Sequence, residues 1–451
     1  MENSPSFLDM LDKEPMNSHR RRAASVVSLG EFIDGYTLLI AGVAAIVLIP
    51  YFHINEGLIG FLTSASFLGS AFGLWIFGYV ADRIGRMTVF RINMLLFIVL
   101  SIISAFIVNV DELFIIRVLV GVTVGMDIPA STGYLSEIVP SAKRGGWVGS
   151  VLNYVWTIGG MSTALLALAL IPFFGDSSWR IMFGIAAVPA LIVYIARLRI
   201  GESPRWLMEN GRESEAKSVL KSWGITTSSN FQETEVIPKK IKRGYADLFK
   251  GIYRKRTGIV TAVFVANCLS GSIATVSTPF ILRYVGLFTY TQTFEFSALV
   301  WLADFIGAFS SFYLIDKIGR RSLTYISMIP AATLAVIMAL FFSNHIILVG
   351  AFFAFGFFNW LGAPSLQWVW SSELFPTSLR GKSQGFCNGW CRIAIVVDAI
   401  IVPLGTAFIG FKDVLLLLSL PLFFYAIMVS IFKEFETAGK SLEVISPEPA
   451  K

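Results

Sequence analysis

The stretch GYVADRIGR at residues 78–86 returns as LIDKIGRR at residues 314–321, about half a chain later. Each copy is a short charged loop between two long apolar segments. A charged loop that is repeated at equivalent points of two hydrophobic halves indicates an internally duplicated membrane protein. Such duplication is typical of secondary transporters, and it predicts a site that lies between the two halves.

The composition places most of the surface in lipid. Of the 451 residues, 55% are hydrophobic and 15% are charged, and the mean hydropathy is +0.70. A soluble domain carries about 25% charged residues. The net charge of +6 does not indicate a nucleic-acid partner, because the basic residues cluster beside apolar segments, as topology determinants do. The three cysteines lie in apolar stretches and predict no disulfide framework.

Twelve apolar segments are long enough to cross a bilayer, because about 20 helical residues span its core of roughly 30 Å. The segments are residues 30–51, 57–80, 88–108, 112–138, 146–171, 180–200, 256–285, 293–315, 322–342, 346–372, 382–410 and 413–432. The sequence therefore predicts an all-α membrane protein. Its expected divisions are a tail at 1–29, a six-helix bundle at 30–200, a central loop at 201–255, a second six-helix bundle at 256–432 and a tail at 433–451.

Lysine and arginine gather at alternate junctions between these segments. The basic junctions include Arg20–Arg22, the loop at 78–86, Lys143 with Arg144, and the central loop. An excess of basic residues marks the cytoplasmic side. Both termini and the central loop are therefore expected in the cytoplasm, in a multi-pass protein of the cell membrane. The polar first 29 residues predict a cytoplasmic tail and not a cleavable signal.

Four further runs accompany the repeated loops. RVLVG at residues 117–121 leads to Glu137 and Arg144, and WRIMFG begins at residue 179. ESPRWL begins at residue 202, and SELFP at residue 372 leads to Arg380. The two loops resemble those of the major facilitator superfamily, and the four runs are most similar to its sugar porter branch. The resemblance runs from about residue 30 to residue 432.

This resemblance implies two bundles that rock about a midplane site and a set of charged residues that close the cytoplasmic side. The matching residues of the first half are Asp82, Arg83, Arg86, Glu137 and Arg144, those of the central loop are Glu202 and Arg205, and those of the second half are Asp316, Arg320, Arg321, Glu373 and Arg380. The alternative is that these charges only set the topology and solvate helix ends.

The sequence departs from the sugar porter pattern in two helices, and in the first of them the acid of the proton-coupled members is missing. The seventh-helix pattern Q-Q-x-S-G-x-N reads NCLSGSI at residues 267–273, and the first-helix pattern G-Y-D-T reads GYTL at residues 35–38. Asp34-Gly35-Tyr36 is similar to the start of the aromatic acid:proton symporters, and DIPAS at residues 127–131 is similar to a run of the phosphate:proton symporters. Arg392 falls where organic-anion transporters often carry an arginine. The substrate therefore stays open between a sugar and an organic anion.

Ionisable residues inside spanning helices are costly and are functional by default. Asp34, Arg117, Asp127, Asp304 and Arg392 lie inside predicted spans, and Asp398 follows two turns after Arg392. Asp127 and Arg392 fall at similar depths, which predicts an ion pair across the cleft. We expect Asp127, with Asp34, to carry a proton, and Arg392 to contact an oxygen-rich or anionic substrate. The alternative is structural pairing of Asp34 with Arg117 and of Arg392 with Asp398.

Polar and aromatic residues on neighbouring helices are expected to complete the substrate site, because rings stack on apolar faces and amides bond hydroxyl groups. The candidates are Trp368, Gln367, Asn388, Trp390, Asn153 and Asn267. Trp368 matches the tenth-helix tryptophan that packs against substrate in sugar porters. The alternative for each residue is packing between helices, which is common for asparagine and tryptophan in membranes.

The sequence shows no phosphate-binding glycine loop, and its three histidines are far apart. We therefore expect no ATP-driven step, no metal site, no cofactor and no enzymatic activity. The predicted function is proton-coupled uptake of a sugar or similar small polar solute by alternating access. The alternatives are a proton-coupled organic acid or anion transporter, a uniporter, and a nutrient sensor that no longer transports. A monomer is expected, because this fold usually needs no partner subunit.

Overall fold

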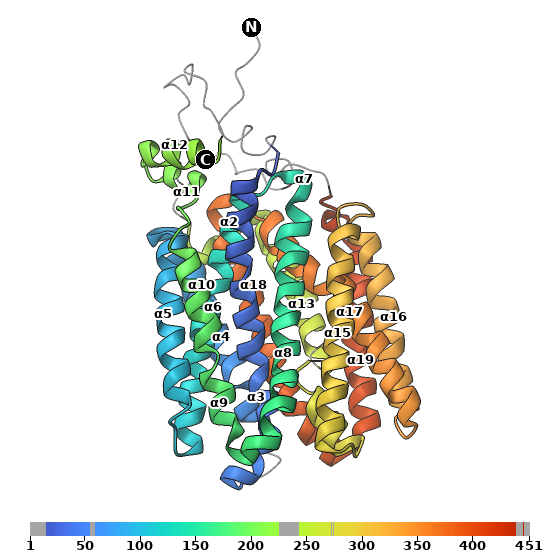
Figure 1. Ribbon diagram of the computed structural model, residues 1–451. Coiled ribbons are helices and arrows are strands. Elements are labelled where there is room, and N and C mark those ends of the chain that lie inside the picture. Colours follow the sequence, from blue (N-terminus) through green and yellow to red (C-terminus); the bar gives the residue numbers. More distant parts are fainter. Residues whose placement is uncertain are drawn as a thin grey trace.

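The computed structural model describes residues 15–54, 59–224, 243–271, 273, 275–438 and 445. The long elements among these residues are all helices, and they run roughly parallel to one another through the molecule (Figure 1). Helices satisfy their own backbone hydrogen bonds, which is why they are the usual way for an apolar chain to cross lipid.

The first half contains α3 (Gly30–Phe52), α4 (Ile59–Ile84), α5 (Arg86–Ser104), α6 (Val110–Ile138) and α8 (Leu152–Phe174). Its sixth crossing is formed by α9 (Ser178–Gly184) and α10 (Ala187–Arg197). The short helices α2 (Ser18–Ser28) and α7 (Ser141–Arg144) precede α3 and α8, and a π-helical stretch, η2 (Gly145–Val151), links α7 to α8.

The second half begins with α13 (Gly251–Gly271), which continues after a break as α14 (Thr278–Phe280) and η6 (Ile281–Val285). It continues with α15 (Tyr290–Leu314), α16 (Arg320–Leu340), α17 (His345–Glu373), α18 (Thr377–Ile409) and α19 (Phe411–Ile431). Ten helical stretches of the described chain are long and apolar enough to span a membrane. One of them, Ala142–Arg197, holds two crossings, and the more polar α13 adds another, so the twelve predicted segments are all present.

One end of the molecule carries the segments between crossings that are rich in charge. This end, called the loop end below, holds α7, α11 (Pro204–Glu209) and α12 (Glu213–Ser222) (Figure 1). Both copies of the repeated loop turn at a glycine with positive φ, Gly85 at 92° and Gly319 at 87°. Glycine adopts this conformation without a steric penalty, and each turn leads directly into the next helix, α5 or α16.

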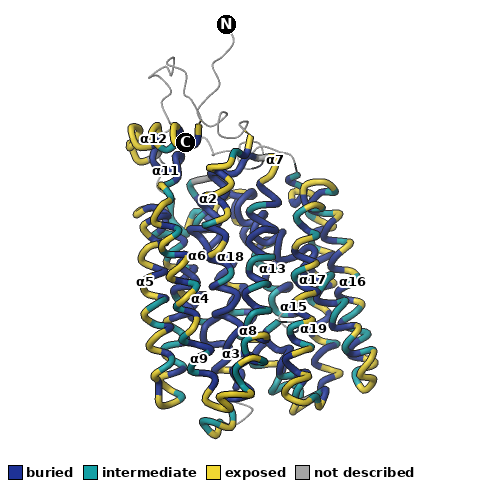
Figure 2. The backbone as a smooth tube through the Cα atoms, viewed as in Figure 1, coloured by how far each residue is buried: buried dark blue, intermediate teal, exposed yellow. Residues whose placement is uncertain are grey.

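The outer helices present apolar side chains to their surroundings. Exposed positions concentrate on the outward faces of α5 and α16, whereas the centre is buried (Figure 2). Exposed side chains on these helices include Ile92, Leu95, Val99, Ile326 and Ile329. Apolar patches of this extent are rare on soluble proteins, so this surface faces lipid.

The two halves meet along α4 with α18 and along α8 with α15. Glycines allow the closest approaches. A Cβ atom at Gly385 would collide with the carbonyl oxygen of Leu74, and one at Gly60 would lie 2.5 Å from the carbonyl oxygen of Ala399. Gly385 lies in the half of α18 nearer the loop end, and Gly60 lies near the opposite end of α4. The halves therefore touch on both sides of the molecular centre.

Candidate transport site

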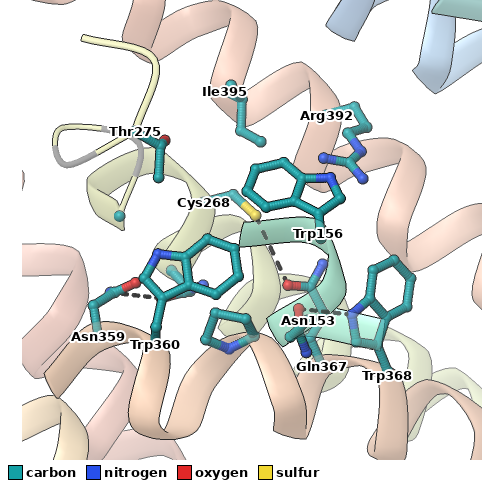
Figure 3. A pocket seen from close by; sticks show the side chains of 13 residues that line it. Asn153, Trp156, Cys268, Thr275, Asn359, Trp360, Gln367, Trp368, Arg392 and Ile395 are labelled. Carbon is teal, nitrogen blue, oxygen red and sulfur yellow. Dashed lines mark hydrogen bonds between the residues drawn. The ribbon is translucent and has the colours of Figure 1, made fainter. Parts of the chain in front are cut away.

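A cavity lies between the two halves, and the space free of protein atoms in and around it, open solvent included, is about 580 Å³. The side chains that line it converge from α8, α13, α17 and α18 (Figure 3). They include Asn153, Trp156, Asn267, Cys268, Thr275, Asn359, Trp360, Gln367, Trp368, Arg392 and Ile395.

Three tryptophans form much of the cavity wall. Trp156 and Trp360 stack with ring centroids 5.1 Å apart and an interplanar angle of 24°. Trp368 donates its indole N–H to Asn153 Oδ1 at 3.2 Å, a bond that joins the two halves. The indole N–H groups of Trp156 and Trp360 are buried without an acceptor among the described residues. The tryptophans thus give the wall three aromatic rings and one polar link between the halves.

The amide side chains are held by one another. Asn359 donates to Asn267 Oδ1 at 3.2 Å, and Gln367 donates to Asn388 Oδ1 at 2.7 Å. Asn388 is buried behind Gln367 and is not among the lining residues, so it positions Gln367. Of the residues predicted for the substrate site, Arg392, Trp368, Gln367, Asn153 and Asn267 line the cavity. Their contact with substrate stays a prediction.

Trp390, like Asn388, does not line the cavity, but it lies farther from it, on the outside of α18. Its side chain is 42% exposed. It packs against Trp75 at 5.6 Å and Phe386 at 6.4 Å between ring centroids. Trp390 follows Asn388 by two residues, which turns it to a different face of α18. In this conformation the predicted contact of Trp390 with substrate has no support, and it stays a prediction.

The lining also includes residues that were not predicted, among them Trp156, Asn359 and Trp360. Trp156 lies three residues after Asn153, and Trp360 lies eight residues before Trp368. Both intervals return a helix to the same face. The signal was therefore present in the spacing, but it becomes informative only when one member of each pair is known to face the cavity.

Arg392 is the charged residue among the described side chains that line the cavity. It is 8% exposed, and its guanidinium carbon lies 5.8 Å from the ring centroid of Phe67 in α4. Within the described residues, no carboxylate comes within ion-pair distance of it. The predicted pair between Asp127 and Arg392 is therefore wrong, as is the alternative pair with Asp398, whose Oδ2 instead accepts from Ser277 at 3.4 Å.

Asp127 is bound within its own half by Arg197 of α10. Arg197 Nη1 lies 2.5 Å from Asp127 Oδ1, and Nη2 lies 3.1 Å from Oδ2. Asn93 donates to Oδ1 at 2.8 Å, and Arg197 also donates to the carbonyl oxygen of Val27 at 2.9 Å. Arg197 escaped the sequence analysis because it lies at the end of its predicted span, where a basic residue normally indicates topology.

Glu31 and Asp34 join Asp127 in a buried cluster of three carboxylates. One oxygen of each lies within 4.8 Å of the others. Ser131 donates to Glu31 at 3.5 Å, whereas Asp34 Oδ2 has no hydrogen-bond partner among the described residues. Glu31 and Asp34 are three residues apart and share a face of α3. The sequence analysis selected Asp34 and overlooked Glu31, which lies at the edge of the predicted span.

The other buried charges are not part of this cluster. Arg117 donates to the carbonyl oxygen of Thr37 and lies 4.8 Å from the ring centroid of Phe183, so the alternative pair of Asp34 with Arg117 is absent. Asp304 of α15 is fully buried against Gly356, and neither of its oxygens has a hydrogen-bond partner among the described residues.

At the loop end, the first half contains a buried ion pair between Arg86 and Glu137 at 2.6 Å. Glu202 Oε2 accepts from the backbone N–H of Met87 at 3.0 Å, and burial raises the pKa of Glu202 above its ordinary value. Arg205 is also buried. Arg83 is exposed and lies over the ring of Tyr79, and among the described side chains it has no acidic partner. The side chain of Asp82 lies outside the described residues.

The second half repeats this arrangement. Arg320 lies 2.9 Å from Asp316 and 3.6 Å from Glu373. Asp316 Oδ2 also accepts from the backbone N–H of Gly146 at 3.0 Å, which joins the two halves at the loop end. Arg321 and Arg380 donate instead to backbone carbonyl oxygens, those of Ser430 at 2.7 Å and Ser372 at 2.9 Å.

A further carboxylate, Glu436, completes the symmetry between the halves. It accepts from the backbone N–H groups of Arg320 at 3.2 Å and Arg321 at 3.1 Å, at the start of α16. Glu202 does the same for Met87 at the start of α5. Helix N-termini favour negative charge. Each repeated loop is thus held by a carboxylate from the segment that follows the last crossing of its half, a role for Glu436 that the sequence analysis missed.

Comparison with known families agrees with this architecture. The family model described as "Sugar (and other) transporter" matches residues 11–448. The chain belongs to this transporter family. It is therefore a multi-pass membrane transporter and not an enzyme, as the sequence predicts.

Individual proteins match along almost the whole chain. The putative metabolite transport protein YaaU of Escherichia coli is 28% identical over 98% of this chain and 97% of that protein. The niacin transporter NiaP of Acinetobacter baylyi is 28% identical over 97% of this chain and 99% of that protein. The major facilitator superfamily proton:xylose symporter XylE bound to 6-bromo-6-deoxy-D-glucose superposes with a TM-score of 0.82 at 21% identity, covering 95% of this chain and 98% of that one. This likeness confirms the predicted major facilitator fold.

Proposed function

We propose that this transporter imports a small ring-bearing carboxylic acid together with protons, by alternating access between its two halves. The observation that carries this proposal is the state of Arg392, a nearly buried cation that lines a tryptophan-walled cavity and has no ion-pair partner among the described residues. A buried charge without a partner is costly, so this position favours an anionic ligand.

The chemistry of the wall suits such a ligand. A guanidinium group binds a carboxylate through two parallel hydrogen bonds. The faces of Trp156, Trp360 and Trp368 offer stacking surfaces for a planar ring. The amides that line the cavity offer hydrogen-bonding groups to polar atoms on that ring. The relative named as a niacin transporter supports the same class, because niacin is an aromatic ring that carries a carboxylic acid.

A neutral sugar is the second candidate. Four amide side chains, those of Asn153, Asn267, Asn359 and Gln367, line the cavity and suit hydroxyl groups. The family description and the structural neighbour XylE favour this reading as well. It leaves the charge of Arg392 without a counterpart in the substrate.

The remaining parts of the proposal concern topology and gating. The basic residues of the loop end favour its placement in the cytoplasm of a cell-membrane protein, with both termini on that side. The contacts of Arg86 with Glu137, and of Asp316 with Arg320 and Gly146, are proposed to hold the loop end closed and to separate when the carrier opens inward.

Uptake by reconstituted liposomes tests this function. We expect an inward proton gradient to drive accumulation of nicotinate, the anion of niacin, but not of its neutral isostere nicotinamide. Arg392→Gln should abolish the accumulation, whereas Arg392→Lys, which keeps the charge, should retain part of it. Gradient-driven accumulation of D-xylose that survives Arg392→Gln would contradict the acid and support the sugar.

A further inference from the structure

We infer that Glu31 and Asp34 form one shared proton site, in which either carboxyl group can take up the proton that accompanies the substrate. The inference rests on the proposed function, because it uses an anion at Arg392 as the signal for proton uptake. It assigns Glu31 to the proton site, so that proton uptake does not depend on one carboxyl group alone.

Glu31 and Asp34 differ from Asp127 in the number of hydrogen-bond donors that contact their carboxylate oxygens. Arg197 holds both oxygens of Asp127, and Asn93 adds a third hydrogen bond. Both oxygens of Asp127 are therefore already engaged by donors. In contrast, Glu31 accepts one long bond from Ser131, and Asp34 Oδ2 is an orphan among the described groups. The two residues with the fewest donors to stabilise a charge are the ones that favour a proton.

The cluster does not suit a metal ion, although three carboxylates meet there. The guanidinium group of Arg197 already occupies the side of Asp127 on which a cation would bind. A Cβ atom at Gly30 would collide with the same guanidinium group and with Asp127, so the backbone of α3 packs directly against this pair. A proton needs no such space.

The charges that act on Glu31 and Asp34 come from three other elements. They are Asp127 of α6, Arg197 of α10 and Arg392 of α18. With all acids ionised, three negative charges oppose two positive ones. The positive charge of Arg197 is already paired with the negative charge of Asp127. The charges of Glu31 and Asp34 are therefore balanced by Arg392. One shared proton makes the empty, buried group neutral, which is the favoured state in a medium of low dielectric constant.

A bound anion changes this balance. A carboxylate at Arg392 neutralises the cation that is not already paired with Asp127, so the cluster becomes neutral again only when a second proton binds. Substrate and proton thus favour each other's binding, as thermodynamic linkage requires. The expected stoichiometry is about one proton for each monovalent anion, and a neutral ligand should bind without proton uptake.

The test measures protons taken up by purified protein in weakly buffered detergent solution at about pH 6.5 when ligand is added, with binding measured in parallel by calorimetry. We expect about one proton for each nicotinate bound in the wild type and none with nicotinamide. The single variants Glu31→Gln and Asp34→Asn should each still take up about one proton for each nicotinate bound, since the other carboxyl group remains. The double variant should bind nicotinate with no proton uptake.

The matched control is Glu31→Gln combined with Asp304→Asn, which also removes two buried carboxyl groups but leaves Asp34. It should still take up about one proton for each nicotinate bound. Loss of uptake in either single variant, or full uptake in the double variant, would overturn the shared site. Sodium-dependent binding at constant pH would overturn it as well. If nicotinate binds without proton uptake, the inference alone fails; if it does not bind at all, the proposed substrate fails and the inference fails with it.

Discussion

Arg197 holds Asp127 by both of its carboxylate oxygens, at 2.5 Å and 3.1 Å, inside the first half of the transporter. The same guanidinium group donates to the carbonyl oxygen of Val27. One residue therefore ties α10 to α6 and to the α2–α3 segment. This arrangement makes the pair a fixed part of the half that moves as a unit, and it leaves Arg392 free to respond to substrate.

The first prediction concerns the stability of this pair. Asp127→Asn removes the carboxylate that binds Arg197 directly and leaves only the more loosely placed Glu31 and Asp34 near this buried cation. Removal of one partner of a buried pair costs about 3–5 kcal/mol. We expect a large fall in the midpoint of thermal unfolding in detergent. Asp127→Asn combined with Arg197→Gln should recover much of the loss, because no charge is then stranded. A double variant that unfolds as early as the single one would contradict this account.

The second prediction separates two tryptophans that lie 22 positions apart. Trp368→Ala removes a ring from the cavity wall and the bond to Asn153, so the KM for substrate should rise about tenfold, which corresponds to about 1.4 kcal/mol. Trp390→Ala, which removes a ring that packs outside the cavity, should leave the KM unchanged. Initial rates of uptake over a range of substrate concentrations provide the comparison. Equal effects of the two variants would argue against the assigned cavity.

The third prediction concerns the loop end. Asp316→Ala removes the acceptor for Arg320 and for the backbone N–H of Gly146, so contact between the halves there should weaken. A cysteine introduced at Ser150, which contacts Ser311 across the same interface, should then react faster with a small thiol reagent in a background without native cysteines. Lys317→Ala, an exposed change in the same loop, is the control and should not alter the labelling rate.

The fourth prediction concerns pH and Glu202. Because burial raises the pKa of Glu202, the folded state binds this proton more tightly than the unfolded chain does. Its contribution to stability is therefore present at low pH and is lost as the pH rises through the raised pKa. As the pH falls from about 8 to about 5, the midpoint of thermal unfolding of the wild type should rise relative to that of Glu202→Gln.

Glu215 provides the matched comparison for this titration. Its hydrogen bond with Arg212 holds the pKa of Glu215 below its ordinary value, although both side chains are exposed. Its contribution is lost as the pH falls, so Glu215→Gln should show a small difference of the opposite sign. The same sign for both residues would contradict the burial of Glu202.

The sequence predicted the fold because each crossing is a long apolar run and the repeated loop marks the duplication. It also placed Trp368, Gln367, Asn153, Asn267 and Arg392 on the helices that surround the cavity. Contacts between side chains were harder to predict. The partner of Asp127 proved to be Arg197, because equal depth in the membrane does not determine which face of a helix a residue occupies. That Trp390 lies outside the cavity could not be predicted, for the same reason.

The central claim is that one proton enters with each monovalent anion, so that transport moves no net charge. Liposomes with a fixed pH gradient and a membrane potential set independently by potassium and valinomycin test it directly. We predict that the pH gradient drives nicotinate uptake and that the potential does not change its initial rate or its final accumulation. Accumulation that follows the potential at zero pH gradient would contradict the account.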